Sequence, residues 1–189
     1  NGFYRHSGFS VTAVARALYR NLSQEKNEGG STITQQLVKN ALLSPEKTWQ
    51  RKVKELILAI AVESIFDKDT ILEMYLNEVG FGGPAYGIQE AARQYFNTDA
   101  ENLALPEAAF LAGLPKAPSK YSPYIHPDLA LSRQNLVLNL MLKDGYISGD
   151  QFSAAIKTKL EFSPPYIKIN AAHFVMYVRD LLVDQYGEE

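Results

Sequence analysis

The chain has 189 residues, which suits one domain, or one domain followed by the start of another. Hydrophobic residues make up 46% and charged residues 21%, as in ordinary globular proteins with a packed core, and a net charge of −2 argues against nucleic acid as a partner. The absence of cysteine excludes disulfides, and no apolar run approaches the roughly 18 residues of a membrane-spanning helix.

Residues 10–22 predict a first amphipathic helix. Val11, Val14, Leu18 and Leu22 fall on one helical stripe, with two arginines off it. The pattern alone predicts that this helix packs against a hydrophobic core.

The run Gly29-Gly30-Ser31-Thr32 predicts the start of a second helix, with Ser31 or Thr32 as its N-cap. Ile33, Leu37 and Ala41 follow at helical spacing and are expected to face the core, while another face of the helix combines Gln36, Lys39 and Asn40. Because backbone N–H groups, hydroxyls and a lysine converge at this helix start, the sequence predicts an anion-binding site, with phosphate as its ligand.

The following segment is basic. Between residues 36 and 55 it contains five cations and two acidic residues, and the second of these, Glu55, follows Arg51 by four positions and Lys52 by three. Such a segment can be an ordinary solvated face with intrahelical ion pairs. Next to the glycine-rich helix start, however, it favours a fixed carboxylate inside a phosphate-binding cleft.

A long helix is expected here, with a buried stripe made by Trp49, Val53, Leu56, Ile57, Ile60 and Ile65. Trp49 is therefore interpreted as a packing residue and not as a platform for a sugar. Asp67 or Asp69 is expected to cap the next helix, which packs through Ile71, Leu72, Tyr75 and Leu76.

The rest of the chain predicts further helices and almost no strand. Residues 80–84 form a tight glycine-rich connection, and helices follow over residues 87–96 and 106–114. A helix over residues 128–143 is expected to pack through Leu129, Leu136, Val137 and Leu140. Ser148 begins a capping box, and residues 174–182 form a last amphipathic helix beyond a proline pair. The predicted fold class is mainly α.

Four stretches of this chain together resemble the family 51 peptidoglycan glycosyltransferases, the polymerase domain of class A penicillin-binding proteins. Residues 29–40 resemble the second motif of that family and residues 51–55 the third. Residues 71–77 with 86–96 resemble the fourth, and residues 107–118 the fifth. The resemblance covers roughly residues 3 to 160 and implies the lysozyme-like superfold.

The first motif of the family is matched only by its tail, in Phe3, His6 and Gly8. The family motif begins with Glu-Asp, which would fall immediately before Asn1, and the resemblance makes that glutamate the general base. We therefore expect residues 1–189 alone to bind substrate but to polymerise weakly or not at all. Phe3 and His6 are expected to support the site without carrying protons.

The resemblance implies a polymerase of lipid II that builds β-1,4-linked glycan strands with inversion and releases undecaprenyl pyrophosphate. It implies that Glu55 has the remaining catalytic carboxylate and that cations neutralise the leaving pyrophosphate, namely Lys39, Arg51, Lys52 and Lys116. Phosphate and sugar oxygens would be held by Ser31, Thr32, Gln36 and Asn40.

No metal cluster is visible in the sequence, so no cofactor is expected to be required, although Glu55 could act through a divalent cation, Mg²⁺ or Mn²⁺. The expected partners are lipid II, the growing glycan strand, moenomycin-like inhibitors and a membrane surface contacted by residues 9–28. The resemblance implies the outer face of the bacterial cytoplasmic membrane, with an anchor outside this chain. Residues 1–162 would form the glycosyltransferase domain, and residues 163–189 an exit segment towards an absent transpeptidase domain.

Two alternatives remain open. A non-catalytic domain of the same fold could bind lipid pyrophosphates or glycan, and a lysozyme-type lytic enzyme could cleave glycan. The lytic enzyme would not need the array of lysines and arginines, because its substrate has no pyrophosphate.

Overall fold

The structure, a computed structural model, describes residues 2–6, 30–44, 48–165 and 172–186. The helix expected over residues 10–22, and with it the membrane contact expected at residues 9–28, lies outside these ranges. Within them the fold is mainly α, as predicted, with one hairpin of two very short strands.

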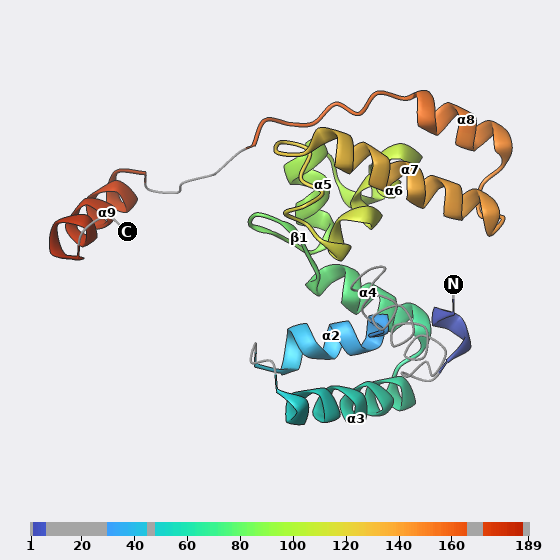
Figure 1. Cartoon of the computed structure of the whole chain (residues 1–189), viewed down its shortest axis with the longest axis horizontal. Helices are drawn as coiled ribbons and strands as arrows, with labels where there is room; N and C mark the ends of the chain where they lie inside the picture. Colours follow the sequence, from blue (N-terminus) through green and yellow to red (C-terminus); the bar gives the residue numbers. More distant parts are fainter. Residues whose placement is uncertain (1, 7–29, 45–47, 166–171, 187–189) are drawn as a thin grey trace, which may run out of the picture.

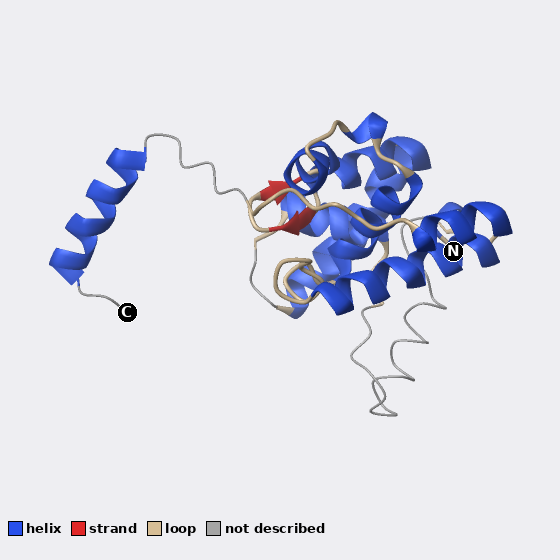
Figure 2. Cartoon of the chain, turned by 90° about the horizontal axis from the view of Figure 1, so that it is seen from above, coloured by secondary structure: helices blue, strands red, loops and turns tan. Residues whose placement is uncertain are grey.

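The helices form two groups joined by α4 (Lys68–Glu78) (Figure 1). One group contains a 3-10 turn η1 (Phe3–Arg5) with α2 (Ile33–Leu42) and α3 (Trp49–Ile65). The other contains α5 (Ile88–Phe96), α6 (Leu105–Gly113), α7 (Pro127–Lys143) and α8 (Gly149–Lys157), with the short turns η2 (Ala100–Asn102) and η3 (Leu114–Lys116). A last helix, α9 (Ala172–Tyr186), stands apart from both groups (Figures 1 and 2).

One hydrophobic core runs through both groups. It joins Phe3 of η1 and Leu37 of α2 to Ile71 and Tyr75 of α4, and it continues into an aromatic cluster around Phe110 of α6. A smaller cluster joins α6, α7 and α8. Because α4 contributes to the shared core, it fixes the position of α2, the helix with the predicted anion site.

The hairpin of β1 (Gly80–Gly82) and β2 (Ala85–Tyr86) follows directly on the end of α4 (Figure 1), and Figure 2 shows its two strands in red. Gly87, which follows it, has a φ of +82°, and a Cβ atom there would lie 2.7 Å from the carbonyl oxygen of Asn77. Only glycine fits both the left-handed backbone and this close approach to α4.

The predicted helix starts are confirmed where they depend on local capping. The side chain of Asp67 accepts a hydrogen bond of 2.8 Å from the backbone N–H of Thr70 and so begins α4. Ser148 and Gln151 form the expected capping box of α8. Each of these signals uses residues three positions apart, so the sequence contains all of the information.

The predicted orientation of α3 is wrong. Its apolar stripe faces solvent: Trp49 is 73% exposed and Ile57 61% exposed. The buried face contains Glu55 and Ala59 instead. Ala59 is completely covered, and the carboxylates on that face find partners on α2, α3 and α4, as described below.

The predicted packing of α7 is wrong in the same way. Leu129, Leu136 and Leu140 are each more than 40% exposed, and of the expected stripe only Val137 packs against a core cluster. The buried residues of α7 are Ala130, Gln134 and Leu138. Gln134 is satisfied there because its Nε2 donates to the carbonyl oxygen of Pro106 at 2.9 Å. On α2, Ala41 was likewise expected to face the core but is exposed.

Candidate functional site

The start of α2 is held by a capping box. The hydroxyl of Thr32 accepts from the backbone N–H of Gln35 at 3.2 Å, and the side chain of Gln35 accepts from the backbone N–H of Thr32 at 3.1 Å. Thr32 is therefore the N-cap, one of the two residues predicted. Since its hydroxyl is engaged in the cap, Ser31 is the residue whose hydroxyl points to other groups.

Glu55 lies on the buried face of α3, and its side chain is only 2% exposed. The ammonium group of Lys52 forms an ion pair with Oε1 of Glu55 and also donates to the hydroxyl of Ser31 at 2.7 Å. The ion pair with Glu55 is the one that their spacing predicted, and through Ser31 the same ammonium also bridges α3 to the start of α2. The side chain of Lys52 remains 53% exposed, so the cation is fixed in position yet open to a ligand.

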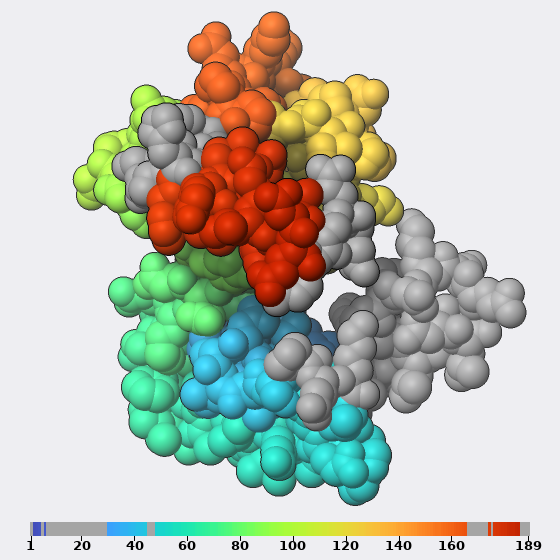
Figure 3. All heavy atoms as spheres, turned by 90° about the vertical axis from the view of Figure 1, so that its left-hand side faces the viewer, coloured from blue at the N-terminus to red at the C-terminus, as the bar shows by residue number. Residues whose placement is uncertain are grey.

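The other predicted ligand-binding residues are distributed around this bridge. On α2, Gln36 is half-buried, while Lys39 and Asn40 are exposed (Figure 3 shows α2 in blue at the surface, above α3 in cyan). Arg51 is half-buried on α3, one turn before Glu55. All four belong to the two helices that Lys52 connects.

Lys116 has a different location. It is exposed on η3, which packs against α6 and β1 in the other group of helices. Among the described residues, it makes no hydrogen bond or ion pair with Ser31, Lys52 or Glu55. The structure therefore brings together three of the predicted site residues by direct contact and leaves Lys116 outside that contact.

Phe3 and His6, expected to support the site, are both well covered. Phe3 is 5% exposed within the shared core, and the imidazole of His6 is 15% exposed. Burial lowers the pKa of His6, as does the nearby ammonium of Lys68, and the carboxylate of Glu63 offsets part of this effect. The lowered pKa favours the neutral imidazole at neutral pH.

The sequence interpretation missed a second buried carboxylate on α3. Glu63 stands eight residues after Glu55, with the buried Ala59 midway between them, and its side chain is 4% exposed. It contacts Thr34 and Lys68, neither of which was singled out. The signal was present in the spacing of Glu55, Ala59 and Glu63, which places them on one helical face.

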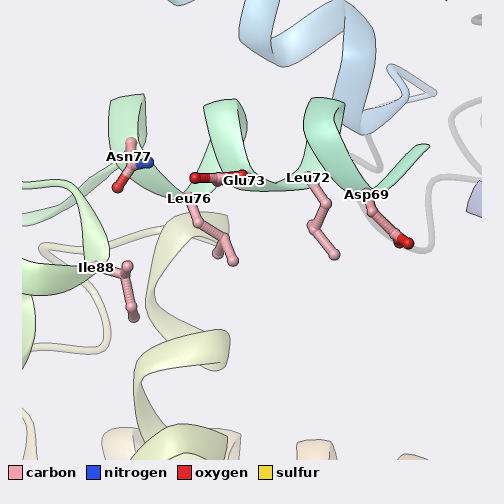
Figure 4. Close-up of a pocket in the computed structure, with 6 residues that line it drawn as sticks. All are labelled: Asp69, Leu72, Glu73, Leu76, Asn77 and Ile88. Carbon is pink, nitrogen blue, oxygen red and sulfur yellow. The ribbon is translucent and has the colours of Figure 1, made fainter. Parts of the chain in front are cut away.

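A groove of about 280 Å³ runs along α4 (Figure 4). Its apolar part consists of Leu72, Leu76 and Ile88, and its polar edge of Asp69, Glu73 and Asn77. These three polar residues follow one another at four-residue spacing on the face of α4 away from the buried Ile71 and Tyr75. None of the predicted site residues lines this groove.

In the ranges that the structure covers, no three His, Cys, Asp or Glu side chains are grouped as metal ligands. Within the same ranges, every helix is too short or too polar to cross a membrane.

Comparison with known proteins gives a consistent result. Residues 1–142 match the family described as Transglycosylase. Penicillin-binding protein 1A of Aquifex aeolicus is 44% identical over 187 residues, which is 98% of this chain and 26% of that protein. Penicillin-binding protein 1F of Bacillus subtilis is 50% identical over 150 residues, which is 79% of this chain and 21% of that protein.

A similar fold is found in the crystal structure of penicillin-binding protein 1A from Haemophilus influenzae. The TM-score is 0.52 at 30% sequence identity, and the match covers 83% of this chain and 20% of that one. The chain thus spans about a quarter or less of the length of these relatives.

Proposed function

Because this chain belongs to the transglycosylase family, we propose that it polymerises lipid II into β-1,4-linked glycan strands at the outer face of the bacterial cytoplasmic membrane. The observation that supports this most directly is the half-exposed Lys52, which the buried Glu55 and Ser31 hold at the start of α2. A fixed cation beside helix N–H groups and a hydroxyl suits a pyrophosphate.

In the proposed reaction, the 4-hydroxyl of the acceptor lipid II attacks the anomeric carbon of the lipid-linked donor strand. The new C–O bond forms as the bond from that carbon to the pyrophosphate oxygen breaks, which inverts an α-linked donor into a β-linked product. The hydroxyl proton goes to a general base. By the family resemblance this base is a glutamate that would stand just before Asn1.

Charge develops on the leaving pyrophosphate, and the cations assigned to it are Lys39, Arg51, Lys52 and Lys116. Ser31, Gln36 and Asn40 hold phosphate and sugar oxygens, while Thr32 contributes mainly through the backbone that it caps. Lys116 comes from the other group of helices, so we propose that it meets the substrate from the opposite side. Phe3 and His6 support the site without carrying protons.

Glu55 is the catalytic carboxylate within these residues. Its negative charge orients Lys52 towards the pyrophosphate and stabilises positive charge on the sugar. We propose that no cofactor is required. If added Mg²⁺ or Mn²⁺ raises the rate, we propose that the divalent cation binds both Glu55 and the pyrophosphate.

The membrane contact is proposed for residues 9–28, with an anchor outside this chain. A further lipid contact is proposed for the exposed stripe of α3, because Trp49, Val53, Ile57 and Ile60 present an apolar surface and Lys54 of the same helix is exposed. Residues 1–162 would form the catalytic domain, and residues 163–189 would lead towards a following domain. Moenomycin-like inhibitors should compete for the same cations.

The test compares lipid II polymerisation by three proteins: residues 1–189, the same chain with Glu-Asp added before Asn1, and that extended chain with Glu55→Gln. Polymer from the extended chain alone supports the polymerase and both carboxylate roles. Tight lipid II binding without polymer in any of the three would favour the alternative, a non-catalytic domain that binds lipid pyrophosphates or glycan. Substantial turnover by residues 1–189 would overturn the assignment of the general base.

A further inference from the structure

A second polar cluster lies at the other end of the buried face of α3. The hydroxyl of Thr34 donates to Oε1 of Glu63 at 2.5 Å, and the ammonium of Lys68 donates to Oε2 at 2.5 Å. The carboxylate is almost completely buried and joins α2, α3 and α4 at one point. Thr34 belongs to the first turn of α2, two residues after the N-cap Thr32.

The same cluster touches the segment of residues 3–6. Nδ1 of His6 lies 4.0 Å from Oε1 of Glu63 and is buried, with no hydrogen-bond partner among the described residues. The ammonium of Lys68 lies 4.6 Å from the centre of the Phe3 ring. One ion pair thus contacts both the turn η1 and the first turn of α2.

A buried ion pair often contributes no more to the stability of the fold than well-packed apolar side chains of similar volume. Stability alone therefore does not explain this ion pair. A carboxylate with two directed donors has a further property, since it fixes the relative orientation of the elements that it joins. The elements joined here are η1, which begins a few residues after the position proposed for the general base, and the start of α2, which we propose holds the pyrophosphate.

We infer that Glu63 and Lys68 are positioning residues for glycosyl transfer, which align the segment of Phe3 and His6 with the start of α2. This inference rests on the proposed function. Glu63 and Lys68 act through the residues that they hold and touch no substrate. Their loss should therefore leave substrate binding by Ser31 and Lys52 largely intact and should slow the chemical step.

The effect should appear in kcat, because a displacement of about 1 Å between reacting groups can cost about 100-fold in rate. In the chain extended by Glu-Asp, we expect Lys68→Met to lower kcat for lipid II polymerisation by about 10- to 100-fold with KM changed less than about 2-fold. Lys68→Arg keeps the cation and should restore most of kcat. Lys157→Met, an exposed lysine of α8, is the matched control and should change neither constant.

A milder pair protects the test against loss of folding. Thr34→Val removes the hydroxyl at nearly constant volume and should lower kcat, while Thr34→Ser retains the hydroxyl and should recover it. All variants are compared only where thermal melts show a folded protein. An unchanged kcat in both Lys68→Met and Thr34→Val, or a rise in KM that accounts for the whole loss, would overturn the inference.

A second readout does not depend on activity. The imidazole of His6 can be titrated by NMR in residues 1–189, with His6→Gln identifying its signal. Lys68→Met removes a charge that lowers the pKa of His6, so that pKa should rise, whereas Glu63→Gln should lower it further. No response of His6 to either substitution would show that the cluster does not hold this segment.

Failure of the proposed function and failure of the positioning inference give different results. If the extended chain with no substitution makes no polymer, the proposed function fails, and the positioning role in glycosyl transfer fails with it, whatever the titration shows. If that chain makes polymer and the substituted chains match it in kcat, only the positioning inference fails.

Discussion

Two clusters on the buried face of α3 have the same composition and different surroundings. Each contains a buried glutamate, a lysine and a hydroxyl from the start of α2: Glu55, Lys52 and Ser31 in one, and Glu63, Lys68 and Thr34 in the other. The side chain of Lys52 is 53% exposed, but that of Lys68 is 20% exposed and lies against the ring of Phe3.

The difference indicates two uses of the same chemistry. An exposed ammonium that a buried carboxylate holds in place can bind an incoming anion without first being ordered. The largely covered ammonium of Lys68 has much less access, so its charge acts mainly on the protein around it. We expect substitutions in the first cluster to affect binding and catalysis, and substitutions in the second to affect stability and alignment.

The largest effect is expected from Glu55→Gln in the chain extended by Glu-Asp. Glutamine keeps the size of the side chain but removes the charge that orients Lys52, so lipid II polymerisation should fall by about 10²- to 10³-fold. Glu101→Gln, an exposed carboxylate of η2, is the control and should be neutral. Full activity of Glu55→Gln would remove the first cluster from the catalytic site.

The clusters should separate most clearly when each lysine is replaced. Lys68→Met leaves Glu63 buried without its cation and should lower the free energy of unfolding by about 3 kcal/mol. Lys52→Met likewise leaves a buried carboxylate, Glu55, without its cation and should cost a similar amount, but it should in addition greatly weaken binding of a moenomycin-like inhibitor, which Lys68→Met should leave largely intact. Urea denaturation and inhibitor titration of both variants provide the measurements, and an equal loss of inhibitor binding in the two variants would contradict the comparison.

The second cluster should also make stability depend on pH. The pKa of His6 in the folded chain lies below its ordinary value of 6.5, so the folded state disfavours the protonated imidazole. Above pH 6.5 the imidazole is neutral in both the folded and the unfolded state, so the free energy of unfolding has its full value. As the pH falls from 6.5 towards the folded pKa, the unfolded state binds more protons than the folded state, and the free energy of unfolding decreases. Denaturation at several pH values should show this loss, by less than Lys68→Met costs, and His6→Gln should flatten it. A flat profile in the unsubstituted chain would show that His6 is not held as described.

The difference between the clusters also explains what the sequence could predict. The first was predictable in part, because Lys52 and Glu55 are three residues apart and Ser31 precedes a recognisable cap, although the contact between Ser31 and Lys52 spans 21 positions. The second depends on contacts between distant residues, since Thr34 and Glu63 are 29 positions apart. Such contacts exist only once α2, α3 and α4 have packed, and the spacing that places Glu63 on the same helical face as Glu55 does not indicate its partners.

The positions of the helices could be predicted because capping signals are local. Their orientations could not, because the buried face is decided by contacts with distant residues. Asp67, Thr32 and Ser148 begin their helices as the capping rules require. The apolar stripes of α3 and α7 are real features of the sequence, but periodicity reports only that such residues share a face. In both helices small or polar residues occupy the buried side, Ala59 between two glutamates in α3 and Ala130 with Gln134 in α7.

The smallest effect on stability is expected on the exposed side of α3. Trp49→Ser should change the free energy of unfolding by less than about 0.5 kcal/mol, because the indole is largely in water before and after unfolding. Ala59→Leu, on the opposite face of the same helix, is the contrast: Ala59 has no exposed surface, so a larger side chain there should cost about 1–3 kcal/mol. The same Trp49→Ser chain should bind vesicles of anionic lipid more weakly if this face meets a membrane. A cost at Trp49 as large as that at Ala59 would mean that the stripe is packed against protein after all, and the two faces of α3 would then have to be reassigned.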